Sequence, residues 1–429
     1  MEKLNEDFII NLSNNKNEPA WMKNFRLNSY KKFLELDNPS FGPKINIDFD
    51  NLVYHKGLFA PPSCSWENVD KKVKNTFNDL GVIDAENKYL KGVSNQYESE
   101  VVYHKMEESD GIIFLSSDEA LKKYPELFEK YFNNLVKYDE NKYTALNGAL
   151  WSGGSFIYIP PYTKVDRPLQ SYFRIDTKNL GQFERTIIIV DHDSSLHYIE
   201  GCTAKNYSTT SLHAGVVEIY VGKNSTCKYS TIQNWSKDVY NLVTKRAILE
   251  EGAYMQWVDG NIGSGVTMKY PSCILKGDNS KASSISIAYA KKGQHLDAGA
   301  KMIHLGKNTK STIISKSIAG FGGASDYRGT VKIAKDATGC FATIKCDNII
   351  LDSISSSNTY PKNIVENNES TLEHEATISK INEEKLNYLM SLGISEDAAK
   401  DLYVLGFMSD FKKSLPMEYA VELNRLIKE

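Results

Sequence analysis

The central part of the chain, from about residue 150 to residue 365, is built from short runs of β-branched and aromatic residues. Five of the clearest runs are 185–190, 216–221, 227–232, 284–288 and 311–315. Turn-forming residues separate such runs at short intervals, at 222–224, 251–252, 277–279 and 306–308. No apolar period of 3.6 residues is sustained here. The pattern predicts many short strands joined by tight turns, as in a solenoid, a sandwich or a barrel.

Among these three architectures, the residue types favour a solenoid. Many of the expected strands are rich in Ser, Thr and Val, and stacked coils accommodate small side chains in their interior. No strict repeat motif is visible. We therefore predict a mainly β fold whose core, residues 146–368, is a β-helix solenoid.

The N-terminal region has a different pattern. Residues 1–145 combine polar loops with signals for short helices. Ser116 and Glu119 have the spacing of a capping box, and Pro125 suits the first turn of a following helix. We predict a mixed α/β domain over this range.

The C-terminal region, residues 369–429, shows apolar stripes at helical spacing. Asn382 and Ser395 suit the N-caps of two helices, and Pro416 suits the first turn of a third. We predict a helical domain whose stripes exceed what so small a unit buries alone, and therefore expect it to bind a partner.

Charge and hydropathy exclude several classes of protein. The net charge of -3 gives no reason to expect nucleic acid or an anionic membrane as a partner. No stretch approaches the roughly 18 apolar residues of a membrane-spanning helix, and residues 1–7 contain no apolar segment typical of a signal peptide. We expect the protein to function where it is made, in the cytoplasm or in the matrix of an organelle that encodes it.

The six cysteines are scattered and form no CxxC motif, which argues against a zinc knuckle or a thioredoxin-type site. We expect reduced thiols. The chain also contains no GxxxxGK[ST] phosphate-binding loop. Any dependence on ATP is therefore expected to come from a partner.

Longer segments carry a resemblance to a known family. They include GQFERT (181–186), YIEGCTA (198–204), IQNW (232–235), NLVTKRA (241–247), DGNIGS (259–264), MKYPS (268–272), LEHEAT (372–377) and LPMEYAVELNRLI (415–427). These segments resemble SufB, the scaffold subunit of the Suf system for iron–sulfur cluster assembly, over nearly the whole chain. Many members carry extra cysteines near the N-terminus, where this chain has only Cys64.

The resemblance implies a right-handed β-helix and a scaffold that is not an enzyme. A nascent, transferable iron–sulfur cluster would form at a subunit interface and pass to apo-proteins. The implied partners are an ABC-type ATPase, SufC, which docks on the C-terminal helices, and SufD or a second copy of this chain, which pairs along the solenoid. Desulfurase or sulfur-transfer proteins would supply sulfur.

The resemblance places the nascent-cluster ligands at Cys346, His374 and Glu375. A thiolate supplemented by an imidazole and a carboxylate suits a cluster that must later leave. In a regular strand, His374 and Glu375 point to opposite faces, so both reach one cluster only at a bulge, a strand end or a subunit interface. The alternatives are that Cys346 is a small core residue and that His374 and Glu375 belong to a surface ion-pair cluster.

The resemblance implies that Cys202 accepts persulfide sulfur and that Gln233, Trp235 and Lys245 line a path from Cys202 to Cys346. Gln233 and Trp235 share a face of a strand. A neighbouring cation would suit an anionic persulfide. We expect Cys202 to be approachable between a strand and a turn and Cys346 to be buried at a pairing surface. The alternatives are that Cys202 is a buried structural thiol, that Trp235 packs in the core and that Lys245 lies on the surface.

Two other functions share the fold. A SufD-like partner subunit would not bind the cluster, and Cys346 with residues 372–375 argues against it. A carbohydrate-active β-helix enzyme would need clustered carboxylates, and residues 191–193 (Asp-His-Asp) are the most visible candidate. Cys227, Cys273 and Cys340 are expected to be core thiols.

Overall fold

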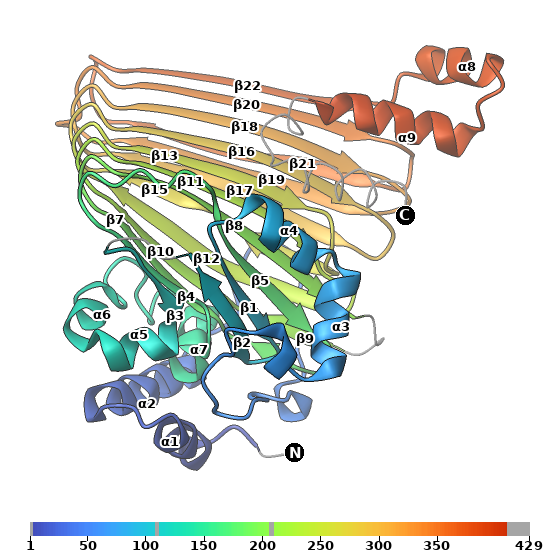
Figure 1. Cartoon of the computed structure of the whole chain (residues 1–429). Helices are drawn as coiled ribbons and strands as arrows, with labels where there is room; N and C mark the ends of the chain where they lie inside the picture. Colours follow the sequence, from blue (N-terminus) through green and yellow to red (C-terminus); the bar gives the residue numbers. More distant parts are fainter. Residues whose placement is uncertain (1–2, 108–110, 206–209, 410–429) are drawn as a thin grey trace.

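The computed structural model describes residues 3–107, 111–205 and 210–409. Most of this part of the chain forms two large β-sheets that together make one long solenoid (Figure 1). From β5 onward the chain alternates between the two sheets, so that each circuit adds a strand to both. The predicted mainly β solenoid is confirmed.

The first sheet contains, in spatial order, β2 (Glu100–Met106), β1 (Gly92–Tyr97), β5 (Leu169–Ile175), β8 (Ser195–Ala204), β11 (Thr226–Asn234), β13 (Tyr254–Asn261), β16 (Lys281–Ala290), β18 (Lys310–Ala319), β20 (Phe341–Ile350) and β22 (Thr371–Lys380). The second contains β21 (Ser356–Val365), β19 (Ala324–Ile333), β17 (His295–His304), β14 (Val266–Lys269), β12 (Val239–Leu249), β10 (Val216–Val221), β7 (Arg185–Val190), β4 (Ser155–Ile159) and β3 (Ile113–Ser116). Three short strands pair beside that path: β6 (Gly181–Gln182), β9 (Ser211–His213) and β15 (Ser272–Leu275).

The described helices flank the solenoid at both ends. They are α1 (Glu6–Asn15), α2 (Ala20–Glu35), α3 (Lys71–Asp79), α4 (Val82–Tyr89), α5 (Ser117–Lys123), α6 (Pro125–Tyr131), α7 (Lys142–Leu150), α8 (Glu383–Ser391) and α9 (Glu396–Phe407). Figure 1 shows α1 to α7 around the first coils and α8 and α9 beside the last ones. No helix within the described ranges is long and apolar enough to span a membrane.

The turns at one corner of the solenoid show how the length of each coil is set. Asn224, Asn279 and Asn308 adopt positive φ angles of 55°, 60° and 55°, a conformation that Asn tolerates better than most residues. Each donates its backbone N–H to a carbonyl in the turn of the next coil. Gly252 occupies an equivalent position, where a Cβ would lie 2.5 Å from Asn224 Oδ1. The turns predicted from sequence therefore stack into a hydrogen-bonded column.

The strands extend beyond the predicted core of residues 146–368. β1, β2 and β3 lie earlier in the chain, yet β1 pairs with β5 in parallel and β3 pairs with β4. β22 continues the first sheet to Lys380, where the sequence placed the helical domain. β22 is largely exposed, so it lacks the apolar alternation that marks a half-buried strand.

The predicted helix starts are confirmed where they fall on described residues. The side chains of Ser116, Asn382 and Ser395 each accept a hydrogen bond from a backbone N–H in the first turn of the helix that follows. Val404 and Met408, near the end of α9, pack against outward-facing residues of the first sheet such as Ile318. The third C-terminal helix, expected at Pro416, lies outside the described residues.

Candidate functional site

A column of polar side chains runs along the inner face of the first sheet. Its members lie in register on successive strands and are Ser171, Glu200, Thr231, Asp259, Ser286, Ser315 and Cys346. None of them is more than 5% exposed. Polar groups are costly to bury without hydrogen-bond partners, and we call these seven residues the polar column. It leads from the neighbourhood of Cys202 to Cys346.

Cys202 lies inside the solenoid, which corrects the expectation of an approachable thiol near a turn. It is in the body of β8, is 1% exposed and stands in register with Gln233 on β11. Its Sγ donates to Glu200 Oε1 over 3.7 Å. Burial, with the Glu200 charge adding to it, raises the pKa of Cys202 well above its ordinary value. The resting side chain is therefore a protonated thiol at neutral pH.

Glu200 is the hub of the site. Its carboxylate accepts hydrogen bonds from Lys245 Nζ at 2.9 Å, from the Tyr229 hydroxyl, from Thr231 Oγ1 at 3.3 Å and from Gln233 Nε2 at 3.4 Å. Burial alone would favour the protonated acid, but Lys245 and Tyr229 lower the pKa of Glu200 to about 2. Glu200 is therefore a carboxylate held ionised within hydrogen-bonding reach of the Cys202 thiol.

The predicted path residues Gln233 and Lys245 converge on this hub. Both are 1% exposed, so the surface reading of Lys245 is wrong. Burial opposes its charged form, yet Glu200 raises the pKa of Lys245 above its ordinary value. Lys245 is thus a cation inside the solenoid.

Trp235 follows the end of β11 and packs into the corner above Cys202. It shares a hydrophobic cluster with Cys202 and Leu180, and its ring lies 4.6 Å from that of His213. Its indole N–H is buried and has no hydrogen-bond partner among the described residues. Trp235 therefore combines a core-packing position with an unused donor near the thiol.

Further ionisable residues, which were not predicted from the sequence as site residues, surround Glu200. Lys269 Nζ bonds Gln233 Oε1 at 3.0 Å and Asp259 Oδ1 at 2.8 Å. His213 bonds Asn241 at 2.9 Å and Glu184 at 2.8 Å. Burial disfavours the imidazolium, but Glu184 raises the pKa of His213. The signal that the sequence offered for these residues was a charged side chain at a strand position expected to point into the solenoid.

Cys346 is fully buried on β20, as expected. Burial, with Asp347 contributing, raises the pKa of Cys346 to about 12. The Tyr327 hydroxyl of the opposite sheet lies against this thiol. Among the described strands, only β22 follows β20 in the first sheet, so Cys346 lies near the last coil.

The structure separates the three predicted cluster ligands between two faces. His374 shares the inner face with Cys346, because Ile344 and Cys346 stand in register with His374 and Ala376. His374 Nδ1 contacts Asn363 at 3.1 Å, while its Nε2 is buried without a partner in the described chain. Glu375 points outward, in register with Lys345 and 3.8 Å from its ammonium. The expected opposite orientation of His374 and Glu375 is confirmed.

These residues do not form a complete metal site within one chain. Within the described ranges, no group of three or more His, Cys, Asp or Glu side chains could hold a metal ion. Cys202 and Cys346 are also separated, because five strand spacings between β8 and β20 amount to about 24 Å. The site is therefore two thiols at opposite ends of a polar interior.

Other candidates from the sequence fall elsewhere. His192 pairs with Asp193 at 3.0 Å in a partly exposed turn, where the neighbouring Asp191 carboxylate accepts hydrogen bonds from the His192 backbone N–H and from the Tyr158 hydroxyl. Cys227, Cys273 and Cys340 belong to the main hydrophobic core, as expected.

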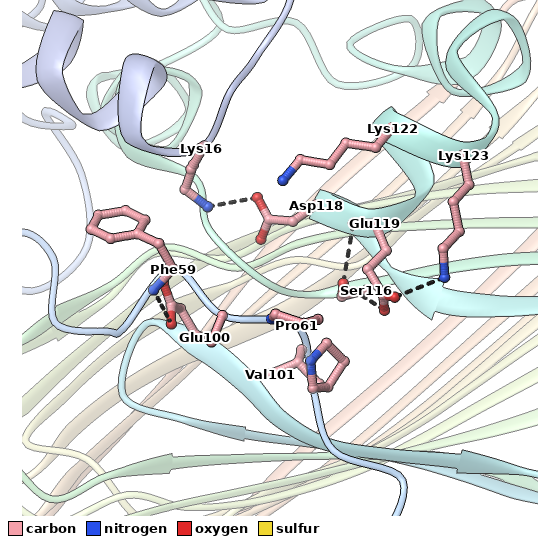
Figure 2. A pocket seen from close by; sticks show the side chains of 12 residues that line it. Lys16, Phe59, Pro61, Glu100, Val101, Ser116, Asp118, Glu119, Lys122 and Lys123 are labelled. Carbon is pink, nitrogen blue, oxygen red and sulfur yellow. Dashed lines mark hydrogen bonds and ion pairs between the residues drawn. The ribbon is translucent and has the colours of Figure 1, made fainter.

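A separate pocket of about 330 Å³ lies between the loop 59–62 and helix α5 (Figure 2). Its lining residues include the ion pair of Lys16 and Asp118, whose Nζ and Oδ1 atoms lie 2.6 Å apart. None of the predicted site residues lines it.

Comparisons with known proteins agree with this architecture. Residues 173–407 match the family model described as "SUF system FeS cluster assembly, SufBD core domain", and residues 69–171 match the "SufBD protein N-terminal region". Proteins described as "Iron-sulfur cluster assembly SufBD family protein" from Staphylococcus aureus (strain MRSA252) and from Staphylococcus saprophyticus are each 54% identical to this chain. Each match covers 99% of this chain and 92% of the relative. The chain therefore belongs to the SufBD family of iron–sulfur cluster assembly proteins.

Proposed function

We propose that this protein is the SufB-type scaffold of its system: it accepts sulfur at Cys202, directs it through the solenoid and builds a nascent cluster at Cys346. The observation that carries the proposal is the polar column, which joins the neighbourhood of one buried thiol to the other through the core of the fold. A cluster-free SufD-like subunit would need neither thiol. The scaffold role makes the protein a carrier and not an enzyme, and places it in the cytoplasm or an organelle matrix.

Sulfur uptake at Cys202 is a thiol–persulfide exchange. The Cys202 thiol loses its proton, and its sulfur attacks the terminal sulfur of a donor persulfide. A new S–S bond forms on Cys202 while the donor S–S bond breaks, and the donor leaves as a thiol that takes up a proton. No net oxidation occurs. Because the Cys202 thiol is buried, uptake requires the surrounding structure to open to the donor.

The cluster, as cargo, needs more ligands than one chain brings together. Cys346 supplies an inner-face thiol, and His374 supplies an imidazole nitrogen that has no partner in the part of the chain that the structure describes. The last strands, β21 and β22, end their sheets without a further strand among the described residues and expose Tyr360 and Ile378, at 43% and 50%. Uncovered edge strands favour pairing with another chain. A SufD-type paralogue or a second copy would complete the site there, with Glu375 reaching across the interface.

The C-terminal helices offer a surface for a SufC-type ATPase. While α9 packs on the first sheet through Val404 and Met408, the other helix, α8, leaves Tyr388 and the adjoining Leu392 exposed at 65% and 61%. Exposed apolar side chains of this size indicate an interaction site. ATP hydrolysis by that partner would drive cluster assembly or release.

Replacing Tyr388 and Leu392 together by Ser is expected to weaken binding of the ATPase at least about tenfold, because apolar anchors dominate such interfaces. Binding is measured by calorimetry with the purified ATPase. The change leaves α9 in place, whereas removal of residues 395–429 would uncover the sheet beneath it. A double variant at exposed Glu383 and Glu384 serves as the control. Unchanged affinity of the Tyr388 and Leu392 variant would refute the docking surface.

The proposed function is tested by anaerobic reconstitution of the full chain with ferrous iron and sulfide. The expected product is brown, with broad visible absorbance, and it transfers its cluster to an apo-ferredoxin. A chain that stays colourless alone, yet enables a paralogue to acquire a cluster, would instead be the SufD-like partner.

A further inference from the structure

A second buried ammonium lies beyond Lys245 on the way to Cys346. Lys269 is the last residue of β14 and is fully buried. Its ion-pair partner Asp259 belongs to the polar column on β13, whereas the partner of Lys245, Glu200, belongs to β8. In the first sheet, β13 lies two strands beyond β8 toward β20. The two ammonium groups therefore follow one another in the direction of the cluster thiol.

The fold itself gives little reason to keep such a pair. Buried ion pairs rarely stabilise a protein more than apolar side chains of the same volume would. Burial lowers the pKa of Lys269, which Asp259 offsets in part. Beyond this pair the path is uncharged: the column continues as Ser286 and Ser315 on the first sheet, and the residues in register with Lys269 along its own, second sheet are Ala298 and Tyr327.

Lys269 also fixes the orientation of Gln233. The Gln233 carbonyl oxygen accepts hydrogen bonds from Lys269 Nζ at 3.0 Å and from Asn241 Nδ2 at 2.6 Å. With two donors on its oxygen, the amide must present its nitrogen to Glu200, 3.4 Å away. Asn241 is held in turn by His213. Lys269 thus contacts both the group next to Cys202 and the column that leads to Cys346.

We infer that Lys269 is a positioning residue of the sulfur path, which orients Gln233 and supplies the second cation for anionic sulfur moving from Cys202 toward Cys346. The inference rests on the proposed function. The moving anion is the persulfide of a small carrier, hydrosulfide: it attacks the outer sulfur of the Cys202 persulfide, the S–S bond on Cys202 breaks, Cys202 regains its proton as a thiol, and HSS⁻ is released. The Cys346 thiol then loses its proton and attacks the outer sulfur of that anion, which forms the Cys346 persulfide and returns hydrosulfide, so no net oxidation occurs and no bond is made or broken at Lys269. The Lys269 ammonium, which bonds Asp259 and Gln233, also attracts the passing anion. This attraction lowers the electrostatic cost of a negative charge in the interior.

The test follows sulfur at each thiol of the full-length protein. Anaerobic protein is loaded with cysteine persulfide, excess donor is removed by gel filtration, hydrosulfide is added, and persulfide on Cys202 and on Cys346 is quantified over time by alkylation and mass spectrometry. The main variant combines Lys269→Gln with Asp259→Asn, which removes both charges and so avoids an unpaired buried ion. Lys269→Arg keeps the cation. A control combines Arg185→Gln with Glu218→Gln, a fully buried ion pair whose partners also contact residues 133–136 outside the solenoid interior.

The expected result is normal formation of the Cys202 persulfide in the main variant but slower arrival of sulfur at Cys346, by about tenfold or more. Lys269→Arg should stay within about threefold of the unmodified chain, and the control pair should move sulfur normally even though its melting temperature falls. Should the double variant not fold, Lys269→Gln and Lys269→Arg give the same comparison of charge lost against charge kept.

Arrival at Cys346 at the normal rate in the uncharged variant, while Cys202→Ala blocks it, would overturn the role of Lys269 and leave the path intact. Equal slowing in the control pair would also overturn it, because a general loss of stability would then explain the effect. If Cys202→Ala itself delivers sulfur to Cys346 normally, the proposed function fails at its first step.

Discussion

Cys346→Ser is expected to lower cluster loading to below about a tenth of that of the unmodified protein while the solenoid stays folded. A hydroxyl is a poor ligand for iron–sulfur centres, and Cys346 supplies the only thiol of the polar column. The fold should tolerate the change, because Ser has nearly the same volume and the in-register neighbour is Ser315. Loading is measured as visible absorbance and bound iron after reconstitution.

Cys340→Ser is the matched control for this substitution. Cys340 is 2% exposed and lies 3.0 Å from the Thr309 hydroxyl, so Ser should replace it with little disturbance. It lies outside the polar column and should load normally. Full loading of Cys346→Ser would refute the assignment of the cluster site, whatever the control shows.

Cys202→Ala is expected to separate two sources of sulfur. Loading from a cysteine desulfurase and its transfer protein should stop, because the acceptor thiol is gone. Loading from free iron and sulfide should continue, because sulfide needs no persulfide acceptor and Cys346 is untouched. Cys346→Ser should block both. Cluster absorbance of the two variants under the two conditions gives a pattern that a structural role for either thiol would not produce.

The control for Cys202→Ala is Cys227→Ala, a thiol of the main hydrophobic core on the neighbouring strand β11. Both changes remove a buried sulfur and should cost stability to a similar degree, of the order of 1 kcal/mol. Only the first should affect uptake from the desulfurase. Normal uptake by Cys202→Ala would make Cys202 a structural thiol and move the acceptor elsewhere.

Several features of the fold could be predicted from local sequence because their causes are local. Side-chain caps such as Ser116 and Asn382 require only a few neighbouring residues. Asn and Gly mark the solenoid turns because those positions need positive φ. The opposite orientation of His374 and Glu375 follows from strand geometry alone. The thiols were singled out by resemblance and not by any local rule.

Tertiary structure decided which side chains meet. Cys202 is buried because neighbouring coils stack on both sides of β8. No property of the segment 198–204 reveals this burial. The polar column exists because residues far apart in the chain, such as Glu200 and Thr231, are placed in register by the stacking of whole coils. The same stacking brought Lys269 to Asp259 and Gln233.

By itself, the sequence determined the kind of structure, strands separated by turns at short intervals, and the chemical groups available to it. Only the three-dimensional fold determined that Lys245 and Lys269 lie inside with carboxylate partners, and that Cys346 and His374 share a face without Glu375. The reason is physical: strand alternation sets which residues share a face, but which face is interior depends on long-range pairing and burial.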